Sequence, residues 1–183
     1  MKIAIETERL LLRRLRPEDL DAWYEMDSDA EVHRYLGKSP ITDLQQLKDV
    51  LANVQQQYID NGIGRWAMLD KNTNTFLGWA GLKLMKEPTQ GHEEYYDLGY
   101  RLLRKHWGKG YATEAAKAWV NYGFEEMNLS EICGRADIGN AASRHVLEKA
   151  GLEYIDDRDF DGQPHAWYCI QKGKWQNHKK QQA

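Results

Sequence analysis

Residues 105–113 read Lys105-His106-Trp107-Gly108-Lys109-Gly110-Tyr111-Ala112-Thr113 and lie between a strand-like segment and a predicted helix. Glycines at Gly108 and Gly110 let backbone N–H groups approach a ligand without a Cβ atom in the way. The N-terminus of the following helix adds unpaired N–H donors and a partial positive charge. Together these features predict a site for a phosphate or pyrophosphate. From the two glycines alone, an ordinary turn before a helix is an equally good interpretation.

Two common nucleotide-binding motifs do not match this loop. A Walker A loop requires G-x-x-x-x-G-K-[ST], and the sequence contains no such stretch. A dinucleotide fingerprint requires G-x-G-x-x-G/A at the first turn of a parallel β-α-β unit. Here Thr113 stands at the third glycine position, and the loop lies near the middle of the chain after a predicted hairpin. A Rossmann-type cofactor site is therefore disfavoured.

The segments around the loop predict an α/β (α+β) domain. Apolar residues at helical spacing, such as Leu47, Leu51 and Val54, indicate helices, and alternating apolar residues indicate strands. The helices are expected from Pro17, over 44–58, from Tyr111 and over 140–149. The strands are expected over 10–15, 65–69, 76–85, 94–103, 131–136, 152–160 and 166–170. One mixed, mostly antiparallel sheet of six to seven strands with helices on both faces accommodates this order.

Composition limits the classes of protein that the chain can represent. Its 183 residues predict one domain, over 1–176, followed by a frayed polar tail at 177–183. A net charge of -3 argues against a nucleic-acid binder. No apolar run reaches the about 20 residues of a membrane span, and no signal peptide is visible, so we expect a cytoplasmic protein. Cys133 and Cys169 form no Cys-x-x-Cys or Cys/His cluster, which predicts neither a bound metal nor a disulfide framework.

Two separate blocks of sequence resemble one known family. The first is 105–115, Lys105-His106-Trp107-Gly108-Lys109-Gly110-Tyr111-Ala112-Thr113-Glu114-Ala115, and the second is 140–152, Asn140-Ala141-Ala142-Ser143-Arg144-His145-Val146-Leu147-Glu148-Lys149-Ala150-Gly151-Leu152. Shorter matches stand at 7–13 and 97–100. The first block is similar to the acyl-CoA loop, [QR]-x-x-G-x-[GA], of the GNAT superfamily of N-acetyltransferases. Both blocks resemble its RimJ/RimL-type branch, and the resemblance covers nearly the whole chain.

This resemblance implies a GNAT-type sheet and a reaction in which acetyl-CoA and a primary amine bind together. The amine then attacks the thioester directly. Two departures stand out: Lys105 replaces the usual Gln or Arg, and Leu147 stands where many family members have a Tyr that protonates the leaving thiolate. The residues implied in acetyl-CoA binding are Leu102, Leu103, Arg104, Lys105, Gly108, Lys109, Gly110, Tyr111, Ala112, Thr113, Asn140 and Ser143.

Catalytic groups are predicted near the central strand and the second block. Ser143 is the candidate hydrogen-bond donor to the leaving thiolate, or else a polar residue at a helix start. Asn140 suits a helix N-cap as well as a contact to CoA. Asp97 is the candidate base, worth about 10²–10⁴-fold in rate, with a salt-bridged strand residue as the alternative. Glu94, just upstream, is the second candidate carboxylate.

The acceptor amine is expected to meet the first two predicted helices, their connection and the last hairpin. His33, Tyr35 and Trp66 are the predicted substrate contacts, although large aromatic residues are more often part of the core. The branch acetylates protein N-termini, free amino acids, antibiotics and small amines, and the sequence does not select among them. A non-catalytic acyl-CoA-binding module and an RNA-associated scaffold are the alternatives. The resemblance to the family is the sole reason to expect a homodimer.

Overall fold

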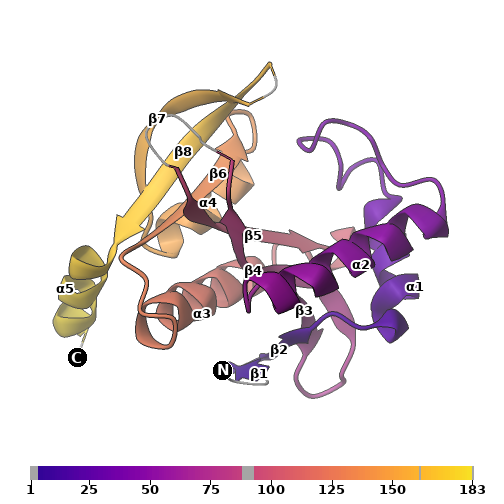
Figure 1. The fold of residues 1–183 in the computed structure, drawn as a ribbon, viewed down its shortest axis with the longest axis horizontal. Helices are drawn as coiled ribbons and strands as arrows, with labels where there is room; N and C mark the ends of the chain where they lie inside the picture. Colours follow the sequence, from indigo (N-terminus) through magenta and orange to yellow (C-terminus); the bar gives the residue numbers. More distant parts are fainter. Residues whose placement is uncertain (1–3, 88–92, 161, 183) are drawn as a thin grey trace.

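The computed structural model describes residues 4–87, 93–160 and 162–182, which form one eight-stranded sheet in the order β1-β2-β3-β4-β5-β6-β8-β7 (Figure 1). All neighbouring strands are antiparallel except β5 and β6. The strands are β1 (Ala4–Glu6), β2 (Leu10–Arg14), β3 (Arg65–Asp70), β4 (Phe76–Met85), β5 (Tyr95–Leu102), β6 (Glu131–Asp137), β7 (Glu153–Phe160) and β8 (Gln163–Gln171).

Helices cover both faces of this sheet, as the sequence predicts. One face carries α1 and α2, and the opposite face carries α3 and α4. The core reflects this division: Trp66 of β3 is fully buried and packs edge-on against Trp119 of α3, with ring centroids 5.0 Å apart. The helices are α1 (Leu20–Asp27), α2 (Leu44–Asp60), α3 (Tyr111–Glu125), α4 (Ala141–Lys149) and α5 (Lys172–Gln182), with 3-10 turns at Pro17–Asp19 and Arg104–His106.

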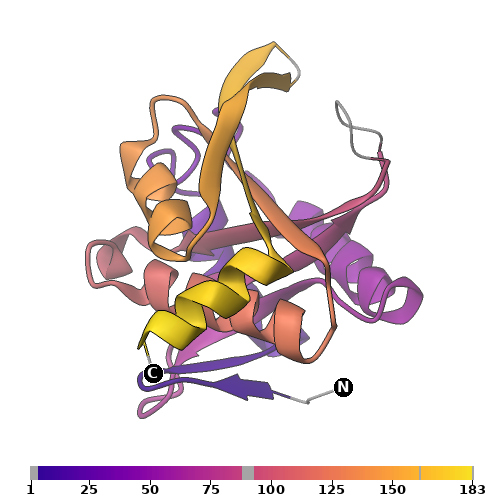
Figure 2. The same cartoon turned by 90° about the vertical axis from the view of Figure 1, so that its left-hand side faces the viewer.

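The sheet opens between β5 and β6. In the described residues a single register pair, Asp97 with Cys133, joins these parallel strands, whereas β4 and β5 share eight pairs. Beyond this pair the two strands diverge, and the hairpin of β7 and β8 rises away from the rest of the sheet (Figure 2). The gap therefore separates two half-sheets at the centre of the molecule.

Three details of the predicted architecture are corrected. The sheet has eight strands because the short β1 pairs with β2, an edge contact too short to leave a periodic pattern. The helix expected at Pro17 begins with a 3-10 turn and becomes α-helical at Leu20. The tail expected to fray is helical to Gln182, while Ala183 lies outside the described residues.

The C-terminal helix is held by an aromatic contact. Trp175 packs on Phe124 of α3 with ring centroids 5.2 Å apart, and its Nε1 donates to Asn121 Oδ1 at 2.9 Å. This packing explains why a sequence of low hydrophobicity forms a helix here, since helices in proteins are stabilised mainly by tertiary contacts.

The expectation that the two cysteines form no disulfide is wrong. Cys133 on β6 and Cys169 on β8 are register partners with Cα atoms 4.0 Å apart, and they form a disulfide. They are 36 residues apart in the chain, so their proximity depends on how the strands pair. The Glu131 carboxylate lies near both sulfur atoms, within 4.8 Å. A metal ion binds thiolates, which a disulfide does not offer, so we propose no metal site there.

None of the helices in the described parts of the chain is long and apolar enough to cross a membrane.

Candidate active site

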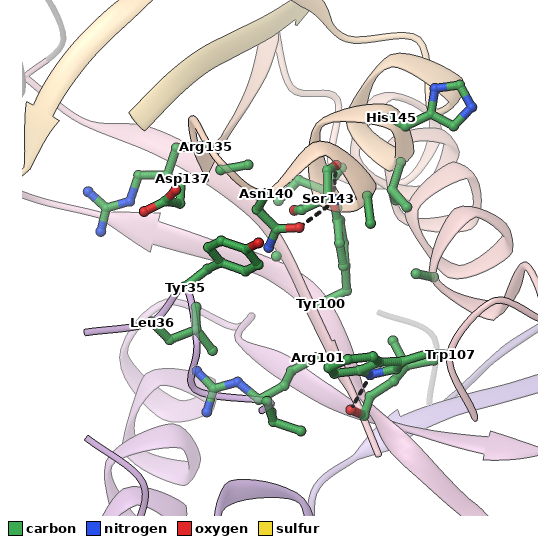
Figure 3. A pocket seen from close by; sticks show the side chains of 18 of the residues that line it. Tyr35, Leu36, Tyr100, Arg101, Trp107, Arg135, Asp137, Asn140, Ser143 and His145 are labelled. Carbon is green, nitrogen blue, oxygen red and sulfur yellow. Dashed lines mark hydrogen bonds between the residues drawn. The ribbon is translucent and has the colours of Figure 1, made fainter. Parts of the chain in front are cut away.

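A cavity of about 1050 Å³ occupies the gap between β5 and β6. Its walls come from elements far apart in the sequence: the start of α3, the start of α4, the connection between α1 and α2, and the β7–β8 hairpin (Figure 3). Glycines and a helix N-terminus line one end, and charged side chains line the other. The cavity therefore has two chemically different ends, one at the α3 loop and one at the α1–α2 connection.

The loop end is built largely from backbone. Gly110 is the N-cap of α3 with φ +81°, and Gly108 has φ +71°, values that favour glycine. A Cβ atom at Gly108 would meet nothing within 4 Å, so the space before the helix is open. Trp107 stabilises the turn by donating from Nε1 to Leu102 O at 2.9 Å. An anion can approach the first N–H groups of α3 here.

A side-chain clamp from the N-terminal segment holds this loop. Arg9 donates from NH1 to Lys109 O at 2.9 Å, and its Nε pairs with Glu114 at 2.7 Å. Glu114 also accepts from Thr7 Oγ1 at 2.6 Å. Burial acts to raise the pKa of Glu114, but the hydrogen bonds from Thr7 and Arg9 outweigh burial and lower it. The matching segment 7–13 thus has a structural role, in which Thr7 and Arg9 hold the loop through Glu114 and Lys109.

Asn140 and Ser143 both line the middle of the cavity. Asn140 is the N-cap of α4, and its Oδ1 accepts from Ser143 N at 3.1 Å. The Oγ of Ser143 lies 3.1 Å from the hydroxyl oxygen of Tyr100, which also donates to Ser143 O at 2.7 Å (Figure 3). Burial raises the pKa of Tyr100, which keeps the phenol protonated.

Tyr100 is a cavity residue that was not predicted from the sequence. Tyr100 lies in the strand expected over 94–103, two residues from Leu98 and from Leu102, and no role was expected for it. A hydroxyl on such a face requires a hydrogen-bond partner, and that requirement is the signal available in the sequence. The partner itself is 43 residues away along the chain.

The two predicted carboxylates are placed differently. Asp97 lines the cavity, but its carboxylate forms an ion pair with Arg65, whose NH1 also donates to Asp97 O at 2.6 Å. This geometry matches the alternative of a salt-bridged strand residue, and the role of Asp97 as base stays a prediction. Glu94 is exposed just before β5 and is not among the residues that line the cavity.

Only one of the three predicted acceptor contacts lines the cavity. Tyr35 does so. Trp66 is 0% exposed in the core, so its prediction as a substrate contact is wrong. His33 is also buried outside the lining, with Nε2 4.0 Å from Asp27 Oδ1. Burial, and then the charge of Arg101, lowers the pKa of His33.

The predicted CoA residues divide in a similar way. The residues that line the cavity are Leu102, Gly108, Gly110, Tyr111, Ala112, Thr113, Asn140 and Ser143. The other four are not among the lining residues. Leu103 is buried and its N–H donates to Leu77 O at 3.0 Å, Lys105 pairs with Glu25 at 2.8 Å, and the carbonyl of Lys109 is bound by Arg9. Arg104 begins the 3-10 turn.

Paired charges and one aromatic ring dominate the other end of the cavity. Two guanidinium groups lie near the Trp79 ring, those of Arg65 at 5.5 Å and Arg101 at 5.1 Å from its centroid. Arg101 in turn donates to Asp27 Oδ1 of α1 at 2.9 Å. These interactions fix side chains on β4 and β5 that face the connection between α1 and α2.

A split sheet with an anion loop after its central strand defines a class of acyltransferases, and comparisons with known proteins agree. The chain matches the Acetyltransferase (GNAT) domain over residues 9–153 and belongs to this family. It is 32% identical over 147 residues to an uncharacterized N-acetyltransferase, p20, of Bacillus licheniformis. The alignment covers 80% of each chain.

Solved structures show the same architecture. A GNAT-family acetyltransferase from Bacillus anthracis superposes with a TM-score of 0.77 at 25% identity, covering 93% of this chain and 99% of that one. A spermidine N-acetyltransferase from Vibrio cholerae, solved with CoA and spermine, gives a TM-score of 0.74 at 20% identity. The match covers 93% of this chain and 100% of that one. At that identity the likeness concerns the fold.

Proposed function

We propose that the protein is an acetyl-CoA-dependent N-acetyltransferase of the RimJ/RimL-like branch, acting on a primary amine in a ternary complex. The observation that carries this proposal is the continuous cavity that runs from the α3 loop, past Tyr100 and Ser143, to the charged end. Such a path lets the two substrates meet between β5 and β6. The predictions of a cytoplasmic enzyme and of a homodimer stay predictions.

The loop end would receive acetyl-CoA. Its pyrophosphate would lie against the N–H groups from Gly108 to Thr113, where the helix N-terminus favours negative charge. The pantetheine arm would follow the exposed edge of β5 towards Ser143. The residues of the loop therefore bind and orient the substrate, and holding both substrates in register supplies a large part of the rate.

Ser143 and Tyr100 would act on the leaving group. When Ser143 donates its hydroxyl proton towards the sulfur, Tyr100 can rotate its single O–H from Ser143 O to Ser143 Oγ, 3.1 Å away, and donate there. This arrangement would stabilise the thiolate by hydrogen bonding. It would take the place of the Tyr that many family members have at the position of Leu147. One proton leaves the amine and one arrives on the CoA sulfur, so the enzyme has no net change of protonation in the cycle.

Calorimetric titration followed by a turnover assay tests the proposal. We expect acetyl-CoA and CoA to bind with micromolar dissociation constants, while NADH and ATP do not compete. A panel of primary amines should then release free thiol from acetyl-CoA. Binding without thiol release from any amine would instead identify the alternative, a non-catalytic acyl-CoA-binding module. Failure to bind CoA would overturn the assignment of the loop.

A further inference from the structure

The charged end of the cavity contains arginines whose charges are neutralised within the protein. Arg65 pairs with Asp97, and Arg101 donates to Asp27 at 2.9 Å. Arg34, at the mouth, lies 3.6 Å from its partner Glu31. Each of these ion pairs leaves little net charge for a ligand.

Arg135 of β6 is the exception. It lines the same cavity, and no carboxylate forms an ion pair with it among the residues that the structure describes. Its guanidinium carbon lies 3.9 Å from the centroid of the Phe160 ring, which stacks on the buried Trp167 at 6.0 Å. Stacking on this aromatic support orients the guanidinium while leaving its N–H groups available.

The register of the strands places Arg135 on the acceptor side of the cavity. Asp97 and Cys133 are partners across the gap, and Arg135 lies two residues beyond Cys133 on the diverging part of β6. A Cβ atom at Gly134 would meet Leu147 of α4, which shows that Arg135 projects to the opposite face of the sheet. The face of Arg135 is thus the face of Asp97, away from α3 and its loop.

Asp137 supplies a complementary negative charge. It lines the cavity two residues after Arg135, about 6.6 Å along the strand and on the same face. Its Oδ1 accepts from Gly139 N at 2.8 Å, and no described Lys or Arg forms an ion pair with it. Figure 3 shows Arg135 and Asp137 together at one end of the cavity, across from Ser143.

We propose that Arg135 binds a carboxylate of the acceptor, so that the enzyme acetylates a small amine that carries a carboxylate close to its amino group, such as a free amino acid. Asp137 then pairs with the ammonium form of the amine, which releases one proton to solvent water before the neutral amine attacks. The guanidinium fork matches a carboxylate with two parallel hydrogen bonds. A polyamine, by contrast, requires several acids, and Glu31 and Asp97 are already paired. This inference rests on the proposed N-acetyltransferase function.

The test compares matched acceptors on the full chain. The panel contains the twenty amino acids, their carboxamides, and the polyamines spermidine and putrescine, with thiol release as the readout. We expect at least one amino acid to have a kcat/KM at least tenfold above that of its own carboxamide. Arg135→Ala should reduce kcat/KM for that amino acid about tenfold or more and remove its advantage over the carboxamide. The KM for acetyl-CoA should not change.

Two further variants separate this role from a structural one. Arg135→Lys keeps the charge without the planar fork and should restore part of the preference. Arg14→Ala removes another exposed arginine that stacks on an aromatic ring, 4.9 Å from the centroid of Tyr58, outside the cavity, and should leave kcat/KM unchanged.

The outcomes distinguish the two levels of proposal. Equal or better turnover of carboxamides or polyamines would overturn the inference while the N-acetyltransferase function stands, as would a preference that survives Arg135→Ala. Absence of thiol release with every amine would overturn the proposed function, and the inference with it.

Discussion

The two ends of the cavity are constructed in opposite ways. At the α3 loop the ligand-facing groups belong to the backbone, and side chains such as Arg9 and Glu114 only hold the loop in place. At the charged end the cavity is lined by side chains on separate strands, and most of their charges neutralise one another. A backbone site recognises a feature common to many ligands, whereas a side-chain site sets selectivity. The first is therefore suited to a shared substrate and the second to a particular acceptor.

The largest expected effect is a loss of CoA affinity caused by a substitution at the loop end of the cavity. Gly108→Trp should weaken CoA binding at least 100-fold, about 2.7 kcal/mol, by filling the open approach to the helix N-terminus. Gly108→Ala is the matched control, because it shares the backbone strain of φ +71° and leaves the approach open. Calorimetry measures both. Equal losses of affinity in the two variants would show that strain, and not steric exclusion, is responsible.

Asp97→Asn tests the charged end of the cavity. Because Asp97 is paired with Arg65, its neutralisation should destabilise the fold by about 2 kcal/mol, which thermal unfolding measures as a lower Tm. If Asp97 also serves as the base, the rising limb of the pH–rate profile will shift or flatten. An unchanged profile with a lowered Tm would assign Asp97 to structure alone.

Tyr100→Phe tests the contact between Tyr100 and Ser143, which lies between the two ends of the cavity. Loss of its hydroxyl removes the partner of Ser143 Oγ, so kcat should fall about tenfold, roughly 1.4 kcal/mol, with little change in the KM for acetyl-CoA. Since burial raises the pKa of Tyr100 above its ordinary value of 10.0, the wild-type rate should show no limb from this group below pH 10. Steady-state kinetics across pH measure both effects, and wild-type kcat in the variant would remove Tyr100 from the mechanism.

The smallest expected effect concerns the clamp on the loop. Glu114 has a lowered pKa in the folded state, so its contribution to stability is present above its ordinary value of 4.5 and is lost as pH falls through the lower folded value. Glu114→Gln should lower the Tm slightly at pH 7 and not below the folded pKa, and should raise the KM for acetyl-CoA a few-fold. A Tm difference that persists at low pH would contradict this account.

Local sequence was sufficient for most elements and for the loop end of the cavity. Apolar residues between Leu44 and Tyr58 recur at helical spacing, and the structure confirms a helix there. Gly108 and Gly110 mark the loop because positive φ angles before a helix are a local requirement, readable within a few residues. Asn140 was likewise predictable as an N-cap, and its side chain accepts from Ser143 N.

Long-range pairing determined the rest. Trp66 could not be assigned to core or cavity from its type, because only the register of β3 and the position of Trp119 bury it. The disulfide, the Asp97–Arg65 ion pair and the Tyr100–Ser143 contact each join residues at least 32 positions apart. The periodicity of a chain specifies which face of an element is buried, but the partner of each side chain depends on strand order and on the opening between β5 and β6.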